Sequence, residues 1–438
     1  MQKVNTAPLS GFMELLPEDQ MEFDRIKQVI LNAHHRNGFV SIDMPLVYRD
    51  EVLLAKAGGE TEKQIYRVSN GLLGENGGAG LALRFDHTVP LATYVAENQG
   101  QLVFPFKVSN IGKNYRGERA QKGRYREFYQ CDCDVIGRGD LDVAYDAEVI
   151  GVICEIYREL DFGKFTIRVS NRKLLNGFLE GIGLEGEKLV EVGRIIDGAE
   201  KVSVEELLKR FNEAGMSSEQ IEKVRRFIAI KGESDEIVRE LSEFGISGEL
   251  FGKGIEELKA VVGLLEKKGM GDCVKVDLMI VRGLDYYTGT VYEAVLDGHP
   301  EIGSISGGGR YDNLTGNYTN ERFQGVGASI GLTRLFYVLK EAGIVGTSKR
   351  SLVDVAIVPF GEEQFEFCYK LAGDLKSKGK NVDVLLQDAK LGKKLACVDK
   401  SGVENVIVVG EDEVATGKAM VKNMASGAIV DLDEWLRG

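Results

Sequence analysis

The chain has 438 residues, a length that fits about two or three domains. With 43% hydrophobic and 28% charged residues it has the composition of a folded globular protein, and it holds no apolar run near the roughly 20 residues that cross a bilayer. Its 55 basic and 68 acidic residues give a formal charge of −13, which disfavours nonspecific DNA binding but still allows a local basic patch for RNA. Residues 1–20 lack the basic and apolar blocks of a signal peptide, and 6 cysteines do not form a disulfide framework in a chain this long. We therefore predict a cytoplasmic protein that has no membrane partner.

Residues 17–37 predict the first long helix. Pro17 suits the first turn, the two acidic residues after it complement the helix dipole, and apolar residues then recur at helical spacing. Residues 40–44 alternate apolar and polar side chains, which indicates a short strand that Pro45 interrupts. The glycine-rich residues 71–80 predict a hairpin or loop.

Residues 124–135 predict a strand with two unlike faces, because side chains alternate across a strand. One face would carry Arg124, Arg126, Phe128, Gln130, Asp132 and Asp134, and the other Tyr125, Tyr129, Cys131, Cys133 and Val135. The first face indicates a binding surface and the second indicates core. We therefore assign Cys131 and Cys133 to the core and expect no metal site, since no second pair stands at zinc-ligand spacing.

Further strands are predicted at residues 165–169, 276–280 and 290–296, and a further helix is predicted from Leu332. Between the first two of these strands, residues 180–271 are charged and helical in pattern. This stretch is interpreted as a helical insertion.

Residues 342–350 are the best linker candidate, because glycine, threonine and serine gather there. Beyond them, short apolar runs alternate with helical stretches, a pattern typical of a small α/β domain with parallel strands. The runs are residues 353–358, 382–386 and 406–409, and the helices are 364–378 and 389–399.

The densest concentration of charge runs from Tyr115 to Arg126. Its arginines suit a polyphosphate, because a guanidinium binds phosphate oxygens in pairs and stays charged. A solvated basic hairpin is the plain alternative. The ring of Phe128 and the amide of Gln130 favour a nucleotide site, since an adenine nucleotide needs a stacking ring, nearby arginines and a carboxylate such as Glu118.

Three further motifs are weak when each is taken alone. Residues 282–289 read Arg-Gly-Leu-Asp-Tyr-Tyr-Thr-Gly, and adjacent tyrosines are more often packing residues than ligands. The glycine run at 306–311 lacks the ending of a P-loop, so it indicates either a turn or a close approach of backbone to a substrate. Residues 325–334 join a glycine-rich strand to a helix that carries Arg334 in its first turn, where a helix attracts anions.

Taken in order, these motifs resemble the class II aminoacyl-tRNA synthetases, and within them the histidyl-tRNA synthetase family. The first helix and strand look like motif 1, Arg116–Gly137 looks like motif 2 and Gly325–Leu335 like motif 3, while Arg282–Thr290 matches the histidine-specific signature. The resemblance implies an α+β fold, with an antiparallel-sheet catalytic domain that holds a helical insertion, and a C-terminal α/β anticodon-binding domain. The implied boundaries are 1–175 and 273–342 for the catalytic domain, 176–272 for the insertion and 351–438 for the anticodon-binding domain.

The resemblance also implies a role for each site residue. The catalytic residues would be Arg116, Arg282 and Arg334. ATP would be bound by Arg116, Glu118, Arg124, Phe128 and Arg334, with the phenylalanine stacked on adenine. Histidine would be bound by Asp86, Thr88, Arg116, Gln130, Asp134, Arg282, Tyr286 and Tyr287, with the first two at its amino group. The amino-group site departs from the family pattern, because Asp86 replaces the glutamate of many members and His87 adds an ionisable group beside it.

The implied activity is that of a homodimeric histidine–tRNA ligase, which forms histidyl-adenylate from histidine and ATP with Mg²⁺ and then charges its tRNA. A helical stretch of the last domain carries four lysines, Lys390, Lys393, Lys394 and Lys400. They would either contact tRNA phosphates or form a solvated face. One alternative is a catalytically silent relative that regulates ATP phosphoribosyltransferase, although such relatives usually lack the arginine at 282 and the last domain. A synthetase for another amino acid is disfavoured by the paired tyrosines, and a nucleic-acid-binding module without chemistry leaves the substrate-type residues unexplained.

Overall fold

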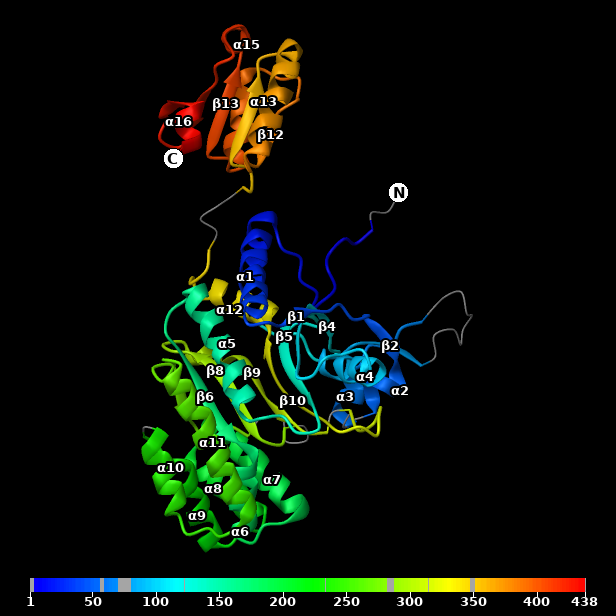
Figure 1. Ribbon diagram of the computed structural model, residues 1–438, viewed down its shortest axis with the longest axis vertical. Coiled ribbons are helices and arrows are strands. Elements are labelled where there is room, and N and C mark those ends of the chain that lie inside the picture. The colour runs from blue at the N-terminus through cyan, green and yellow to red at the C-terminus, as the bar shows by residue number, and fades with distance from the viewer. Residues whose placement is uncertain are drawn as a thin grey trace. The chain divides into compact units, whose positions relative to one another are not determined.

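The computed structural model of the protein describes residues 4–55, 59–69, 80–121, 123–232, 234–281, 287–313, 315–346 and 351–437. Contacts divide the chain into two compact units, whose elements Figure 1 traces. The large unit comprises Met1–Glu14 and Arg25–Val345, and the small unit comprises Leu15–Asp24 and Gly346–Gly438.

The large unit is built on one sheet, in which the described residues place 8 strands in the order β1-β4-β5-β10-β9-β8-β6-β7. The strands are β1 (Val40–Ser41), β4 (Phe106–Tyr115), β5 (Glu127–Arg138), β6 (Phe165–Asn171), β7 (Val274–Val276), β8 (Thr290–Leu296), β9 (Ser304–Tyr311) and β10 (Phe323–Ile330). Neighbours from β4 to β6 are all antiparallel, whereas the edge strands β1 and β7 pair in parallel with β4 and β6. The predicted antiparallel-sheet fold is confirmed.

The strand predictions are met to different degrees. β8 has the predicted bounds, and β6 contains residues 165–169. β1 is shorter than residues 40–44 predict. The strand predicted at 276–280 is wrong, because β7 ends at Val276 and the Met279 N–H then donates to the Asp277 carboxylate, 3.0 Å away, in a turn.

Among the helices beside the sheet of the large unit are α1 (Pro17–Arg36), which belongs to this unit in part, α4 (Thr88–Asn98), α5 (Ala144–Leu160) and α12 (Leu332–Glu341). α1 confirms the helix predicted at 17–37. A second, two-stranded sheet pairs β2 (Val47–Arg49) with β3 (Leu81–Leu83) beside the short helices α2 (Asp50–Leu54) and α3 (Gly59–Gln64). The loop predicted at 71–80 lies outside the described residues except for Gly80.

The segment predicted as a helical insertion is helical, and its helices gather in one group beside the sheet edge formed by β6 and β7 (Figure 1). They are α6 (Arg172–Gly181), α7 (Gly186–Asp197), the 3₁₀ turn η2 (Ala199–Lys201), α8 (Val204–Glu213), α9 (Ser218–Ala229), α10 (Ser234–Ser242) and α11 (Glu249–Lys267). α6 and α11 cross closely at two glycines: a Cβ on Gly177 would lie 2.4 Å from the Phe251 nitrogen, and one on Gly254 would lie 2.3 Å from the Leu174 nitrogen. The glycines therefore permit the close backbone contact between α6 and α11 within this group of helices.

The small unit contains a mixed sheet in the order β12-β11-β13-β14-β15. Its strands are β11 (Val355–Pro359), β12 (Val382–Val384), β13 (Asn405–Val409), β14 (Met420–Asn423) and β15 (Ile429–Asp431), and its helices are α13 (Phe365–Ser377), α14 (Leu391–Lys400), α15 (Glu411–Thr416) and α16 (Leu432–Arg437). The parallel pairing of β12, β11 and β13 is as predicted. The sheet continues antiparallel through β14 and β15, which the short apolar runs do not reveal.

Lys394 departs from the predicted row of exposed lysines on α14. It is buried, and its ammonium donates to the Pro359 carbonyl oxygen at 2.8 Å. Lys390, Lys393 and Lys400 are exposed. A phosphate contact by Lys394 is therefore excluded, because its only charged group faces the interior of the small unit.

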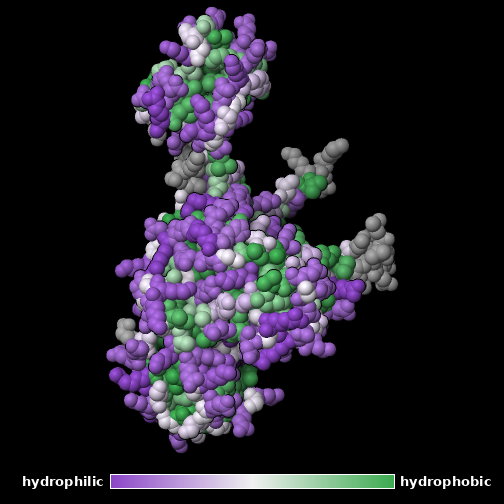
Figure 2. All heavy atoms as spheres, viewed as in Figure 1, coloured by the Kyte–Doolittle hydropathy of each residue, from purple (hydrophilic) through white to green (hydrophobic). Residues whose placement is uncertain are grey.

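Apolar side chains gather inside both units. One cluster of the large unit joins α4 to the sheet through buried residues that include Leu91, Val95, Val108 and Ile136. Figure 2 shows hydrophilic residues over most of the visible face, with apolar residues in small groups among them. Within the described ranges, no helix is both long and apolar enough to cross a membrane.

Candidate active site

The large unit holds an open cavity of about 560 Å³ that is bordered by the central strands β5, β9 and β10 and by the first turns of α4 and α12. Nine of the twelve residues that sequence analysis assigns to substrate binding line it. They are Asp86, Thr88, Arg116, Glu118, Arg124, Phe128, Gln130, Tyr287 and Arg334. Segments from four separate parts of the sequence are thereby brought to one place.

Two arginines on different segments meet at one part of the cavity. Arg124 lies 3.7 Å from the Glu118 carboxylate. Arg334, in the first turn of α12, donates to the Ile302 carbonyl oxygen at 2.9 Å. Gly123, which directly precedes Arg124, lies next to Arg334, since a Cβ on it would be 3.6 Å from the Arg334 Cγ. The cation of Arg334 therefore adds to the positive end of the α12 dipole at a place suited to phosphate.

Arg116 stands between these arginines and the acidic part of the cavity. Its guanidinium carbon is 4.5 Å from the ring centroid of Phe85 and 5.0 Å from that of Phe128, and its Nε donates to the Phe85 carbonyl oxygen at 3.2 Å. Burial lowers the pKa of Arg116, and the negative charge of Asp86 opposes this lowering more than any other neighbour. A guanidinium nevertheless stays charged, so Arg116 is a fixed, partly desolvated cation.

The acidic part of the cavity begins where α4 starts. The Asp86 carboxylate accepts the Val89 N–H at 3.0 Å, which fixes it at the helix N-terminus next to Thr88. Burial raises the pKa of Asp86. Asp132, on β5, lines the same cavity.

A smaller cavity of about 30 Å³ adjoins the main one, because Thr88, Asp132, Tyr287 and Ser329 line both. Asp134 lies in this smaller cavity, where it accepts the Tyr311 hydroxyl at 2.8 Å. Burial, together with the charge of the nearby Asp132, raises the pKa of Asp134 to about 8. Asp134 can therefore hold or release a proton near neutral pH.

The space for Asp134 and Tyr311 comes from glycines on the neighbouring strand. Gly327 pairs with Asp134, and a Cβ on it would lie 1.9 Å from the Asp134 Oδ1. Gly325 pairs with Tyr311, and a Cβ on it would lie 2.2 Å from the tyrosine Cε2. The glycine-rich start of β10 is thus needed for side chains of β5 and β9 to enter the site.

Gln130 is held at both ends of its amide. Its Nε2 donates to the Ser329 hydroxyl at 2.5 Å, and its Oε1 accepts from the Asn114 side chain at 2.8 Å. The orientation of the amide is therefore fixed before a substrate arrives.

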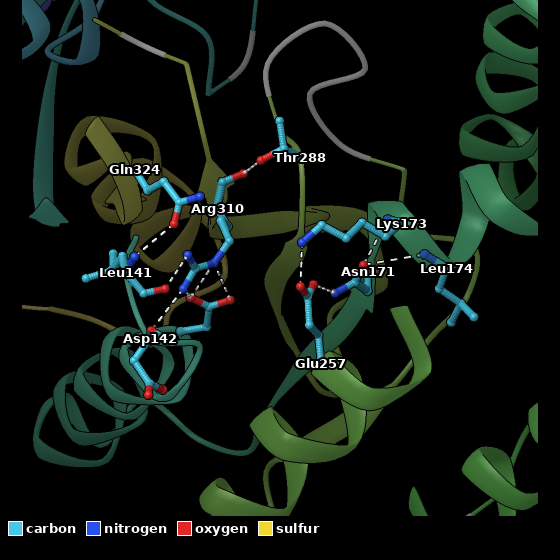
Figure 3. A network of polar contacts seen from close by, with 10 residues as sticks. Leu141, Asp142, Asn171, Lys173, Leu174, Glu257, Thr288, Arg310 and Gln324 are labelled. Atoms are coloured by element: carbon cyan, nitrogen blue, oxygen red, sulfur yellow. Dashed lines mark hydrogen bonds and ion pairs between the residues drawn. The ribbon is translucent and has the colours of Figure 1, made fainter. Parts of the chain in front are cut away.

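Behind the cavity, Arg310 of β9 ties the sheet to the start of α5 (Figure 3). Its guanidinium pairs with the buried Asp146 at 2.7 Å and donates to the carbonyl oxygens of Leu141 and Asp142 at 2.9 and 3.0 Å. The Arg310 carbonyl oxygen accepts the Thr288 N–H at 2.8 Å, next to the cavity residue Tyr287. Arg310 is thus a structural support of the site.

Several residues assigned from the sequence need a separate account. Arg282 and Tyr286 lie outside the described residues. Arg126, predicted on the binding face, instead donates to the Glu118 carbonyl oxygen at 3.0 Å, because β5 begins only at Glu127 and alternation does not extend to residue 126. Tyr125 and Tyr129 border the cavity although alternation predicts the opposite face for both.

Sequence reasoning also gives no substrate role to Asp132, Ser329 or Tyr311. Alternation along 124–135 and the motifs at 306–311 and 325–334 point to these positions, but only pairing of β5, β9 and β10 brings them together.

The cavity combines cationic and anionic parts. Arg124 and Arg334 suit phosphate oxygens, and Asp86 and Asp132 suit an ammonium group. A small α-amino acid beside a nucleoside triphosphate would place its charges accordingly. Among the described residues, no cluster of three or more His, Cys, Asp and Glu side chains is arranged to hold a metal ion.

Two family models match the chain. One described as histidyl-tRNA synthetase matches residues 11–335, and one described as an anticodon binding domain matches residues 354–435. A curated histidine–tRNA ligase of Clostridium tetani is 47% identical over 426 residues, which cover 97% of this chain and 95% of that protein.

Solved structures agree with these matches. The crystal structure of histidyl-tRNA synthetase from Nostoc sp. PCC 7120 has a TM-score of 0.92 and 35% identity, and covers 99% of each chain. An ATP phosphoribosyltransferase regulatory subunit/histidyl-tRNA synthetase from Bacillus halodurans C has a TM-score of 0.77 over 93% of this chain and 99% of that one. At 21% identity the latter shows the shared fold alone.

Proposed function

The chain belongs to the histidyl-tRNA synthetase family, and from that premise we propose that its main cavity is where histidine is activated. The protein is a histidine–tRNA ligase, which converts L-histidine and ATP to histidyl-adenylate and pyrophosphate and then transfers histidine to the 3′ end of its tRNA. The observation that carries the placement of the site is the meeting of Arg116, Arg124 and Arg334 with the carboxylates of Asp86 and Asp132 in one cavity.

ATP binds at the arginine-lined part of the cavity. The Phe128 ring stacks on adenine and Glu118 accepts from its amino group, while Arg124 and Arg334 contact the outer phosphates. Arg116 contacts the α-phosphate. Mg²⁺ enters with the nucleotide as part of the MgATP substrate, which is its usual mode because it keeps several waters and few protein ligands.

Histidine binds at the acidic part. Its ammonium group lies between Asp86 and Thr88, and its imidazole faces Asp134 and Tyr287 in the direction of the smaller cavity. The predicted roles of Tyr286 at the imidazole and of Arg282 at the carboxylate and the α-phosphate belong to the same proposal. A substrate without ring nitrogens would leave buried polar groups unpaired, which is the strongest basis for excluding other amino acids.

The chemical step needs positioning more than proton transfer. The histidine carboxylate is already ionised at neutral pH, so it attacks the α-phosphorus without a general base. Arg116 and Arg282 hold the two anions in line and neutralise the charge that develops on the phosphate. Loss of one fixed donor of this kind costs about 3 kcal/mol of barrier.

We further propose a cytoplasmic homodimer in which residues 1–175 and 273–342 form the catalytic domain, 176–272 the insertion and 351–438 the tRNA-reading domain. The anticodon-binding family model at 354–435 supports the last assignment. The alternative of a regulatory subunit is disfavoured, because the relatives with 41–47% identity are named as ligases. The solved structure whose name includes a regulatory subunit is only 21% identical.

ATP–pyrophosphate exchange with each amino acid in turn tests the function. We expect exchange with histidine alone, and a loss of about 100-fold or more in Arg116→Ala, because a fixed α-phosphate donor is removed. If the wild-type protein shows no exchange at saturating histidine and MgATP, the ligase assignment is wrong and the alternative of a regulatory subunit is favoured.

A further inference from the structure

His87 and Asp132 form a buried pair beside the amino-group site. The His87 Nδ1 lies 3.1 Å from the Asp132 Oδ2, and the two residues are 1% and 5% exposed. A carboxylate oxygen accepts, so Nδ1 carries the hydrogen and donates. This bond ties the segment that holds Asp86 and Thr88 to the middle of β5.

The second oxygen of Asp132 lacks a hydrogen-bond partner among the described residues. This oxygen, Oδ1, is buried, and Asp132 lines both the main cavity and the smaller one. A buried carboxylate oxygen without a partner is costly, so such a group indicates a binding role.

Two described arginines near this pair have other partners. Arg84 donates to the carbonyl oxygens of Met44 and Lys113 at 2.8 and 2.9 Å. Arg116 donates to the Phe85 carbonyl oxygen and lies over two aromatic rings. Burial is the main cause of the raised pKa values of Asp86 and Asp134, and the negative charge of Asp132 raises both further. A bound cation would relieve this repulsion.

We propose that Asp132 is a second carboxylate for the α-ammonium group of histidine and that His87 is the positioning residue that holds it there. This inference rests on the proposed function, because it adds to the amine site of the same substrate. An ammonium group has three donors, and Asp86, Thr88 and Asp132, which all line the main cavity, carry side-chain oxygens that can accept them. Without the bond from Nδ1, the Asp132 carboxylate is free to turn away.

Two ligands that differ at the amino group test the contact. L-histidinol keeps the ammonium and imidazole groups, whereas imidazole-4-propionic acid keeps the imidazole and carboxylate but has no ammonium. By calorimetry, Asp132→Asn should weaken histidinol binding about tenfold or more and leave imidazole-4-propionic acid within about twofold. Equal weakening of both ligands, or of neither, would overturn the role of Asp132.

The role of His87 is tested by a pair of variants. Asn keeps an N–H close to the position of Nδ1, and Leu does not. In the exchange assay His87→Leu should raise the KM for histidine about tenfold with near-normal kcat and KM for ATP, because an ammonium contact is made equally in the ground and transition states. His87→Asn should recover most of the loss, and His35→Leu, at an exposed histidine of α1, should match wild type.

These outcomes separate the inference from the function on which it rests. A wild-type protein without histidine-dependent exchange would sink the proposed function. Normal wild-type exchange with His87→Asn as impaired as His87→Leu, or with the KM for ATP raised equally, would sink only the positioning role.

Discussion

Asp134 shows how a single buried carboxyl links the site to stability. Burial raises the pKa of Asp134 to about 8 from an ordinary 3.8. Between these values the folded protein holds a proton that the unfolded chain releases. The free energy of unfolding therefore loses a contribution from this group as pH rises from about 4 to about 8.

Asp134→Asn should remove this pH dependence. The amide is nearly isosteric and can still accept the Tyr311 hydroxyl, but it carries no charge at any pH. The melting temperature of the substrate-free variant minus that of wild type should rise from pH 5 to pH 8.5 by a few degrees. Asp140→Asn is the control, because it makes the same substitution at an exposed side chain. A difference that stays flat or falls over this range would mean that Asp134 is ionised in the folded protein throughout.

Strand β10 shows what an element contributes beyond its own side chains. Gly325, Gly327 and Ser329 occupy alternate positions and so share one face. On the β9 side Gly325 pairs with Tyr311, and on the β5 side Gly327 pairs with Asp134 and Ser329 with Asp132. Small residues on the middle strand leave the volume that larger polar residues from both neighbours fill.

Gly327→Ala should disable the histidine site while preserving the fold. The new Cβ would lie 1.9 Å from the Asp134 carboxylate, so the carboxylate must move, at a cost of about 1–3 kcal/mol. We expect the KM for histidine in the exchange assay to rise at least tenfold and the KM for ATP to change little. Gly263→Ala on α11 is the matched control, because its Cβ would meet nothing within 4 Å. A Gly327→Ala enzyme with normal histidine KM would show that Asp134 does not bind the substrate.

Alternation explains which parts of this site can be foreseen. It places Phe128, Gln130 and Asp132 on one face because a strand has a period of two, and all three line the cavity. It misplaces Arg126 because the strand begins after that residue. The contact between His87 and Asp132 is beyond any local pattern, since 45 residues and a whole strand separate the two positions.

The same reasoning applies to helix α14. Leu391, Lys394, Leu395 and Val398 follow helical spacing, and the three apolar residues among them pack in one cluster of the small unit. That period places Lys394 on the inner face, where its ammonium meets the Pro359 carbonyl oxygen. Charge alone groups it with the exposed lysines, so the helical period is the better guide at this position.

At the scale of the whole molecule, the cavity and the match to an anticodon-binding domain lie in different units. All described cavity residues belong to the large unit, and the anticodon-binding family model lies within the small unit. Adenylate formation needs only histidine and MgATP, whereas transfer also needs tRNA. Changes confined to the small unit should therefore separate the two half-reactions.

The exposed lysines at α14 provide this test. Reversing the charge of Lys390, Lys393 and Lys400 to Glu should raise the KM for tRNA in aminoacylation and reduce its salt dependence, because phosphate contacts release counterions. ATP–pyrophosphate exchange should stay at the wild-type rate. The control reverses Lys370, Lys376 and Lys378 at α13 and its C-terminal end, which makes the same change in net charge on another helix of the same unit. If both triple variants raise the KM for tRNA equally, α14 makes no specific contact and its lysines form a solvated face. If exchange falls as well, the small unit takes part in activation and the division between the units is wrong.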